Sequence, residues 1–325
     1  MASIFHYTDT AGAIGILSSQ SLFASDIRYL NDSSEGALID SLLAPMFLEE
    51  VAGATRELVD AGLLSKRYYE EMGANADRLQ VEAIFRSIRR TINNVSPSFV
   101  VSFCRHEDGS EQFQHGLLSQ WRGYAGRGGF AFEFDEEGLD ALLKAEVERF
   151  FFGPGATRDV LYNNFEQIFH REDYEGLAKA IVGQIFLDPK VTPVVGLTKR
   201  KKIAEIAGEK NVDQAIAKYV SVAPFLKHYG FHEEREYRIA ISCLPKHRIP
   251  AGAKKPAKPI EFRTRGDLIL PYVRLFGEPG AKLPIKGVIV GPHPHQTLQG
   301  DAIERLLQET DCGAYIRLSG IPFRG

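Results

Sequence analysis

The sequence predicts an α+β protein whose sheets are mixed and mainly antiparallel. Three observations lead to this prediction. Short apolar segments typical of strands are spread along the whole chain of 325 residues, while helical periodicity gathers in two blocks, near 36–95 and 160–230. No internal repeat or low-complexity tract is visible. We therefore expect residues 1–325 to form a single domain with two helical insertions.

The strongest strand prediction is the segment 98–104, SFVVSFC, which is apolar on both alternating faces. A central strand that is covered on both sides has this pattern. The segment 129–135, GFAFEFD, alternates so that its three phenylalanines share one face. A first strand is expected over 3–8, followed by a helix that Asp9 caps. Further strands are expected at 22–25, 147–152, 235–243, 260–263, 268–272, 288–290 and 315–318.

The helical block near 36–95 shows one apolar face most clearly at Val81, Ile84, Phe85, Ile88 and Ile92. Pro45 and Gly62 are expected to divide this block into separate helices, because proline interrupts helical hydrogen bonding. A short helix over 117–125 would place Leu117, Trp121 and Tyr124 on one side. Other helices are expected over 164–186, 212–219 and 302–307.

Composition and charge exclude several classes of protein. The chain is 44% hydrophobic and 25% charged, which argues against disorder and against a disulfide-stapled miniprotein. Its 39 basic and 42 acidic residues give a net charge of -3, which argues against a surface that is basic all over. Three cysteines without a CxxC pair predict a reducing compartment. With no secretion signal or bilayer-spanning segment, we expect a cytoplasmic location and no membrane partner.

Several motifs, distributed over nearly the whole chain, resemble one bacterial family. They are Phe5-His6-Tyr7-Thr8, Gly15-Ile16-Leu17, Leu22-Phe23-Ala24-Ser25, Leu30-Asn31-Asp32 with Glu35, Val101-Ser102-Phe103, Gln120-Trp121-Arg122 with Tyr124-Ala125, Glu234-Arg235-Glu236-Tyr237-Arg238, Gly291-Pro292 and Ser319-Gly320-Ile321-Pro322-Phe323-Arg324. Together they resemble the bacterial domain-of-unknown-function family 2971. Phe231 departs from the family pattern, which tends to have tryptophan there, and this affects only local packing.

The layout is more distantly similar to ADP-ribosyltransferases. The shared features are a histidine on the first strand, a Gly-Ile-Leu turn after it, a central aromatic residue and a late strand with glutamate. This fold-level resemblance implies an ADP-ribosyltransferase-like core that cleaves the nicotinamide–ribose bond of NAD without a metal. It also implies transfer of ADP-ribose to a macromolecular acceptor, protein or nucleic acid, in toxin action or antiviral defence.

The chemistry of that reaction calls for a carboxylate. Cleaving the nicotinamide–ribose bond creates an oxocarbenium-like centre, which a nearby carboxylate stabilises. If residues 234–238 form a strand, its period of two places Glu234, Glu236 and Arg238 on one face. By the resemblance, Glu236 would lie at the ribose, and Glu234 would orient or deprotonate the acceptor.

The resemblance also implies roles for residues that bind NAD. His6 would hydrogen-bond the adenosine-side ribose, and Tyr7 or Tyr124 would stack on the nicotinamide. Arg122 or Arg238 would pair with the pyrophosphate. The other residues expected around the cleft are Thr8, Asn31 and Trp121.

Each assignment has a structural alternative. The acidic pair and Arg238 would equally well form a salt-bridge ladder on a solvated face. The aromatic residues of the short helix are more often packing residues than ligand contacts. His6 would more often be a structural histidine, and Asp32 a helix cap.

Two other functions stay open from the sequence. A metal-dependent nuclease or hydrolase would use the oxygen ligands of Asp32, Glu35, Glu234 and Glu236 for magnesium or manganese. A non-catalytic nucleotide-sensing protein would keep the pocket without turnover. The basic run 199–202 is a candidate patch for a nucleic-acid acceptor.

Overall fold

A computed structural model describes residues 2–30, 38–60, 62, 65–126, 128–153, 155–162, 170–187, 217–244, 246, 249 and 252–322. The chain divides into two compact units. The first consists of residues 1–31, 98–160 and 229–325, and the second of residues 32–97 and 161–228. The segments expected as helical insertions contribute most of the second unit, and the single-domain architecture stays a prediction.

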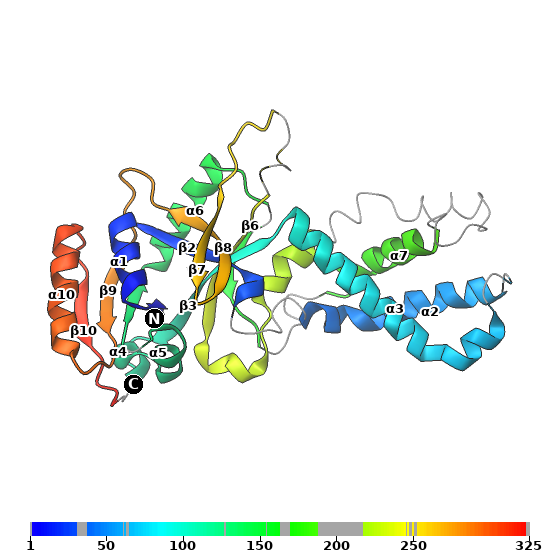
Figure 1. Cartoon of the computed structure of the whole chain (residues 1–325), viewed down its shortest axis with the longest axis horizontal. Coiled ribbons are helices and arrows are strands. Elements are labelled where there is room, and N and C mark those ends of the chain that lie inside the picture. The colour runs from blue at the N-terminus through cyan, green and yellow to red at the C-terminus, as the bar shows by residue number, and fades with distance from the viewer. Residues whose placement is uncertain are drawn as a thin grey trace. The chain divides into compact units, whose positions relative to one another are not determined.

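A mixed, mainly antiparallel sheet forms the centre of the first unit, which confirms that part of the predicted fold class (Figure 1). Its main path runs through β10 (Tyr315–Leu318), β9 (Ile285–Val290), β4 (Phe130–Phe134), β1 (Ala2–Thr8), β3 (Ser98–Glu107), β2 (Ser21–Asp26), β8 (Leu268–Phe276) and β7 (Ile260–Arg265). β6 (Glu236–Ser242) pairs with β3, and β5 (Ala156–Asp159) pairs with β6. Among the described strand pairs, β9 with β10 is parallel and the others are antiparallel.

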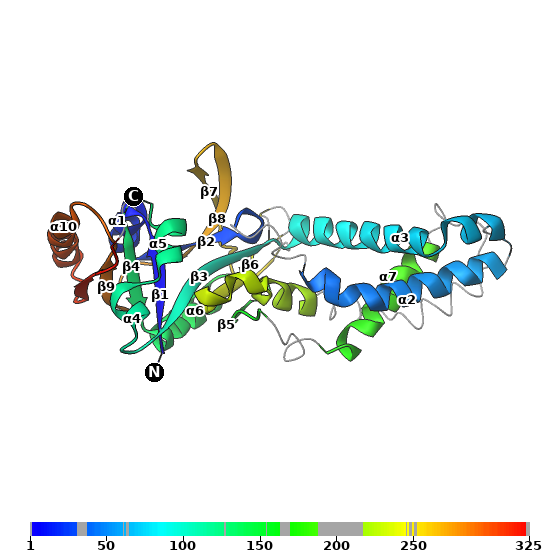
Figure 2. The same cartoon turned by 90° about the horizontal axis from the view of Figure 1, so that it is seen from below.

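β3 is the central strand that its sequence predicts, and it has two different neighbours along one edge. β1 pairs with its C-terminal half, where Phe5 lies opposite Cys104. β2 pairs with its N-terminal half, where Ser25 lies opposite Val100. β6 follows the other edge over residues 98–104. β1 and β2 therefore separate beside residues 101–103, and Figure 2 shows them running in different directions there.

The two faces of this sheet are covered by different helices. One face carries a large apolar cluster that includes Phe99, Val101 and Phe103. Residues of α1 (Thr10–Ser19), α6 (Glu136–Arg149) and α10 (Gln296–Glu309) complete that cluster. The opposite face carries Phe5, Tyr7 and Trp121, and it is the face on which α4 (Glu111–His115) and α5 (Leu118–Tyr124) lie. Asp9 caps α1 as predicted, since its Oδ1 accepts a hydrogen bond from the Gly12 amide (2.7 Å).

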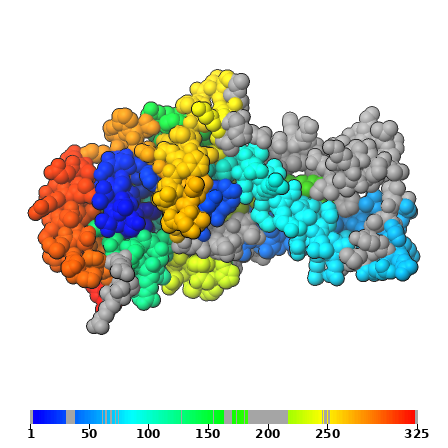
Figure 3. All heavy atoms as spheres, viewed as in Figure 1, coloured from blue at the N-terminus to red at the C-terminus, as the bar shows by residue number. Residues whose placement is uncertain are grey.

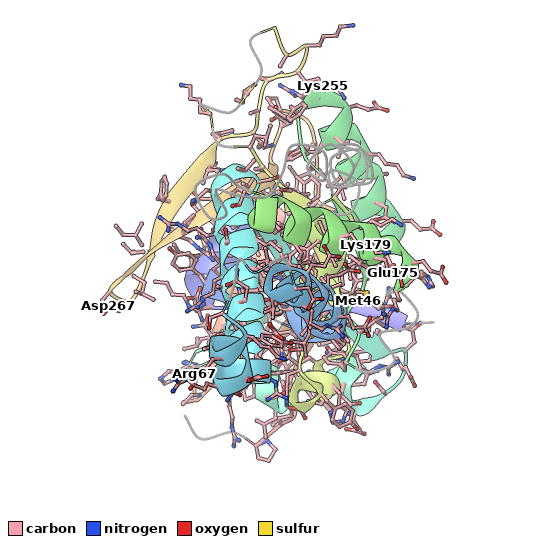
Figure 4. The ribbon with its side chains drawn as sticks, turned by 90° about the vertical axis from the view of Figure 1, so that its right-hand side faces the viewer. Met46, Arg67, Glu175, Lys179, Lys255 and Asp267 are labelled. Carbon is pink, nitrogen blue, oxygen red and sulfur yellow. The ribbon has the colours of Figure 1, made fainter. Side chains whose placement is uncertain are left out.

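The described part of the second unit is helical. α2 (Leu38–Asp60), α3 (Lys66–Val95) and α7 (Glu172–Leu187) contribute to one apolar cluster, and Figure 4 shows α7 beside α2. Pro45 lies inside α2, so the expected division there is wrong. The buried neighbours Leu43, Met46 and Phe47 keep the helix packed across the lost hydrogen bond. Gly62 does follow the end of α2, with a φ of 69°. No helix of the described residues is long and apolar enough to cross a bilayer.

Two strand predictions in the first unit need correction. The segment 147–152 is not a strand, because α6 extends to Arg149. The next strand, β5, was not expected because it is short and polar, with the sequence ATRD. The strand expected over 235–243 begins at Glu236 instead. Arg235 has a φ of 43°, and a 3₁₀ helix, η4 (Tyr229–Glu234), precedes it.

Candidate functional site

The predicted acidic strand contains a buried ion pair. Glu236 and Arg238 point to the same face of β6, and their side chains join through two hydrogen bonds. Nε of Arg238 donates to Oε1 of Glu236 (2.6 Å), and Nη2 donates to Oε2 (2.9 Å). Glu236 is 3% exposed and Arg238 is fully buried. A salt-bridge ladder on a solvated face is therefore wrong as a description of this pair.

Glu234 does not share that strand face. It is the last residue of η4, and the left-handed conformation of Arg235 separates it from β6. Glu234 is nevertheless buried. The continuous strand that the pattern E-x-E-x-R predicts does not form, because a backbone turn at Arg235 breaks the alternation. Asn31, Asp32, Glu35 and the basic run 199–202 lie outside the described residues.

The guanidinium of Arg238 compensates the negative charge of a carboxylate that has little contact with water. Burying an unpaired carboxylate is costly, and a two-bond arginine pair offsets that cost. The arrangement keeps an anion in the interior of the first unit, beside the central strand β3. Among the described residues, no group of three or more His, Cys, Asp or Glu side chains could hold a metal ion.

The strand registers show which side chains share the face of this ion pair. Glu236 lies opposite Cys104, and Arg238 lies opposite Ser102. The next pair on this face belongs to a row of paired residues that crosses four strands: Ala240, Val100, Ser25 and Tyr272. Directly opposed residues point to the same face of a sheet. The Glu236 face thus continues from β6 over β3 to β2 and β8.

On β2, β7 and β8 this face carries a group of aromatic and basic side chains. The rings of Phe23 and Tyr272 stack, with centroids 4.3 Å apart. The Arg263 guanidinium carbon lies 5.5 Å from the Phe23 centroid and 5.8 Å from the Tyr272 centroid. Nη2 of Arg263 also donates to Oγ of Ser25 (3.1 Å). We call Phe23, Tyr272 and Arg263 the arginine–aromatic group.

A second arginine in this region has a carboxylate partner. Nη2 of Arg274 donates to Oε2 of Glu261 (2.9 Å), which also accepts from the Tyr272 hydroxyl (2.7 Å). The carboxylate of Glu261 therefore compensates the positive charge of Arg274 and holds the Tyr272 ring in its orientation. Arg263 has no such carboxylate within ion-pair distance anywhere in the described parts of the chain.

His6 lies at the place where β1 and β2 separate. Its Nδ1 forms a hydrogen bond with the Ser102 carbonyl (2.9 Å), and its ring lies edge-on to Phe103. Burial lowers the pKa of His6, and the Arg263 cation lowers this pKa further. Strand pairing places the Cβ of His6 with Phe132 on one face and the Cβ of Glu236 with Cys104 on the other. The strand alternation therefore does not bring His6 together with Glu236, although Arg263 lies near enough to act on the His6 ring.

Tyr7 and Trp121 are packing residues in this structure. Tyr7 is 6% exposed, and its hydroxyl forms hydrogen bonds with the His106 ring and the Leu117 amide. Trp121 is 1% exposed and lies edge-on to Tyr7 (4.8 Å), while its Nε1 donates to the His115 carbonyl (3.0 Å). Because both rings are buried, neither presents a face on which nicotinamide could stack. Both side chains therefore have the structural packing role that the sequence left open as an alternative.

The remaining predicted residues are spread around β1 and α5. Thr8 ends β1 and is partly buried. Arg122 and Tyr124 are exposed on α5, which covers the Tyr7 side of the sheet. Tyr124, at 37% exposure, is the predicted aromatic residue that a ligand could reach.

The arginine–aromatic group was missed at the level of sequence. The alternation in the segment 260–265, IEFRTR, could have indicated it, because it places Glu261, Arg263 and Arg265 on one face of a strand. The stacking of Phe23 on Tyr272 joins residues about 250 positions apart, and no local pattern reports such a contact.

Part of the chain is similar to a known protein family. A family described as "Protein of unknown function (DUF2971)" matches residues 120–239, which include the Gln120–Ala125 and Glu234–Arg238 motifs. No curated protein and no solved structure matches the chain. Over residues 120–239, which hold the buried Glu236–Arg238 pair, the chain is similar to the DUF2971 family of proteins of unknown function.

Proposed function

We propose that this protein is an ADP-ribosyltransferase-like enzyme that cleaves the nicotinamide–ribose bond of NAD, with Glu236 as the carboxylate at the ribose. The observation that supports this best is the buried pair of Glu236 and Arg238 in the strand beside β3. A carboxylate that stays charged away from water is the group that an oxocarbenium-like centre requires.

In this reaction the bond between C1′ of the ribose and the nicotinamide nitrogen breaks, and nicotinamide leaves with the electron pair. The negative charge of Glu236 stabilises the positive charge that develops on the ribose. A nucleophile of the acceptor then attacks C1′ and loses its proton. Protein and nucleic acid both supply such nucleophiles, and Glu234 is the nearest acid in sequence that could take the proton.

The burial of Glu236 sets a condition on this proposal. Since the side chain is 3% exposed, the segments that cover it must move when NAD binds. Arg238 also competes with any cation for both oxygens of Glu236. This competition counts against a metal-dependent hydrolase that would use the same carboxylate as a ligand, and it also requires that the pair loosen before Glu236 stabilises a positive ribose.

The test measures nicotinamide release from NAD by the purified full-length protein and by Glu236→Gln. Removing the charge should lower turnover by about 100-fold or more, the usual loss for an electrostatic group at a developing charge. Because Glu236→Gln removes the carboxylate charge that pairs with the buried Arg238 guanidinium, the variant should also lose about 3–5 kcal/mol of stability. Turnover is therefore expressed per folded molecule, from urea unfolding under assay conditions.

Glu146→Gln is the matched control. Glu146 is also buried and pairs with the buried Lys258, while it accepts from the Phe276 amide (3.1 Å). It lies on α6, on the opposite face of the sheet. Equal loss of turnover per folded molecule in both variants, or no nicotinamide release by the wild-type protein, would overturn the proposal.

A further inference from the structure

We propose that the arginine–aromatic group of Phe23, Tyr272 and Arg263 binds the diphosphate of a dinucleotide. This inference rests on the proposed function for the identity of the ligand. It assigns the phosphate subsite to residues that differ from Arg122 and Arg238, the two arginines that the resemblance suggested.

The first argument is geometric. Two stacked rings lie beneath the Arg263 guanidinium, at 5.5 and 5.8 Å from their centroids, and Ser25 accepts one of its hydrogen bonds. An arginine held on aromatic rings keeps its planar donors in a fixed orientation. Less side-chain entropy is then lost when those donors bind two phosphate oxygens.

The second argument is charge. Arg274 is compensated by Glu261, whereas Arg263 has no carboxylate within ion-pair distance among the described residues. Asp9 acts on Arg263 only at longer range, and its Oδ1 already accepts from the Gly12 amide. Partial burial and the neighbouring Arg265 cation both lower the pKa of Arg263. An anion bound here would therefore relieve an unfavourable charge.

The third argument is position. Ser25 accepts a hydrogen bond from Arg263. It lies in the same row of paired residues as Ala240 of β6, two strand spacings or about 10 Å away. Arg238 is the next residue on that face of β6. Glu236 follows on the same face, four residues or about 13 Å along β6 from Ala240. A dinucleotide bound in extended form on this face would contact Arg263 with its diphosphate and run towards Glu236 with its nicotinamide half.

The group is also accessible. Arg263 is exposed on β7, which ends the main path of the sheet. Figure 3 shows atoms of the β7–β8 hairpin on the surface beside the N-terminal residues, and Figure 4 shows its tip, Asp267, projecting from the molecule. A ligand can thus reach Arg263 before the segments over Glu236 move.

The experiment measures binding of ADP-ribose, ADP and nicotinamide riboside to the full-length protein by calorimetry at two salt concentrations. Arg263→Met keeps the apolar stem and removes the charge, and Arg263→Lys keeps the charge without the planar fork. Arg265→Met is the matched control, because Arg265 lies two residues further on the same strand face. Melting temperatures check that all variants fold.

We expect Arg263→Met to weaken ADP-ribose and ADP binding by about tenfold or more, with a smaller loss in Arg263→Lys. Nicotinamide riboside has no diphosphate, so its binding should not change. In turnover assays Arg263→Met should raise KM for NAD with little effect on kcat. Arg265→Met removes a neighbouring cation but leaves the donors of Arg263 in place, so it should weaken ADP-ribose and ADP binding clearly less than Arg263→Met does.

The outcomes separate this inference from the proposed function. If nicotinamide is not released but ADP-ribose binding depends on Arg263, the phosphate subsite stands and the enzymatic proposal fails. If NAD is cleaved while Arg263→Met binds ADP-ribose as tightly as wild type, the subsite is wrong. Binding of single-stranded oligonucleotides, but not ADP-ribose, through Arg263 would also overturn it, since the ligand would then be a nucleic acid.

Discussion

The Tyr7 hydroxyl lies 2.7 Å from Nε2 of His106 and accepts a hydrogen bond from the Leu117 amide (2.8 Å). In a neutral ring that donates from Nδ1, Nε2 is an acceptor, so the Tyr7 hydroxyl donates its proton to Nε2. His106 Nδ1 in turn lies 3.0 Å from the Arg105 carbonyl, to which it donates. Burial is the main cause that lowers the pKa of His106 to about 4, which keeps the ring neutral at pH 7.

This pKa predicts how stability depends on pH. The folded pKa of His106 lies below the ordinary value of 6.5, so the unfolded chain binds more protons between these two values. The free energy of unfolding should fall as the pH drops from 6.5 towards 4, by up to about 3 kcal/mol from this residue. His106→Gln, which keeps an acceptor for Tyr7, should flatten that fall in urea unfolding at pH 7, 6 and 5.

His6 contributes in the same direction, because burial lowers its pKa as well. The slope in His106→Gln should therefore decrease without vanishing. An unchanged slope would show that His106 takes up its proton equally in the folded and unfolded chain.

Tyr7→Phe should destabilise the protein by about 1–3 kcal/mol, because the Leu117 amide loses a buried acceptor. Nicotinamide release per folded molecule should stay at the wild-type value, since Tyr7 packs under α5. Tyr229→Phe is the control: its ring is 53% exposed, and its loss of a hydroxyl should change stability by less than about 0.5 kcal/mol. A selective loss of turnover in Tyr7→Phe would restore Tyr7 as a ligand contact.

Gly291→Ala should lower stability by about 1–3 kcal/mol, the usual cost of overpacking. A Cβ at this position would lie 2.9 Å from the Gly129 carbonyl oxygen and 3.0 Å from the Trp121 ring. Gly15→Ala in α1 meets nothing within 4 Å and should stabilise the protein by about 0.5–1 kcal/mol. Trp121 is the single tryptophan, so its fluorescence reports both unfolding transitions.

Glu236 and Arg238 should show strong coupling in a double-mutant cycle. Glu236→Gln and Arg238→Met each leave a buried charge without its partner and should each cost about 3–5 kcal/mol. The double variant should cost clearly less than the sum of both, because it removes both charges. Urea unfolding of the four proteins measures this difference, and additive losses would mean that the two side chains do not stabilise each other.

Local apolar patterns made the central strands predictable. The patterns around 98–104 and 129–135 extend over whole strands and need no information from elsewhere in the chain. The segment 147–152 misled because its first three residues are the exposed end of α6, and the three phenylalanines that follow are partly buried without forming a strand. Pro45 misled because packing within the second unit outweighs the local effect of a proline.

The candidate site was less predictable than the strands. Glu236 and Arg238 were correctly placed on one strand face, because their spacing is local. The burial of Trp121 depends on contacts with Tyr7 and His115. The position of the Arg263 guanidinium depends on aromatic rings from β2 and β8. Such contacts arise from the strand order, which a single sequence does not specify.

The position of β3 between early and late partners affects how the chain is made. β1 and β2 are synthesised before β3, but its other edge is covered by β6, whose first residue comes 129 positions after the last residue of β3. Until Glu236 leaves the ribosome, a strongly apolar strand has one unpaired edge, which is a template for aggregation. Chains that stop before residue 236 should therefore be insoluble, and the nascent protein should depend on chaperones that hold exposed strands.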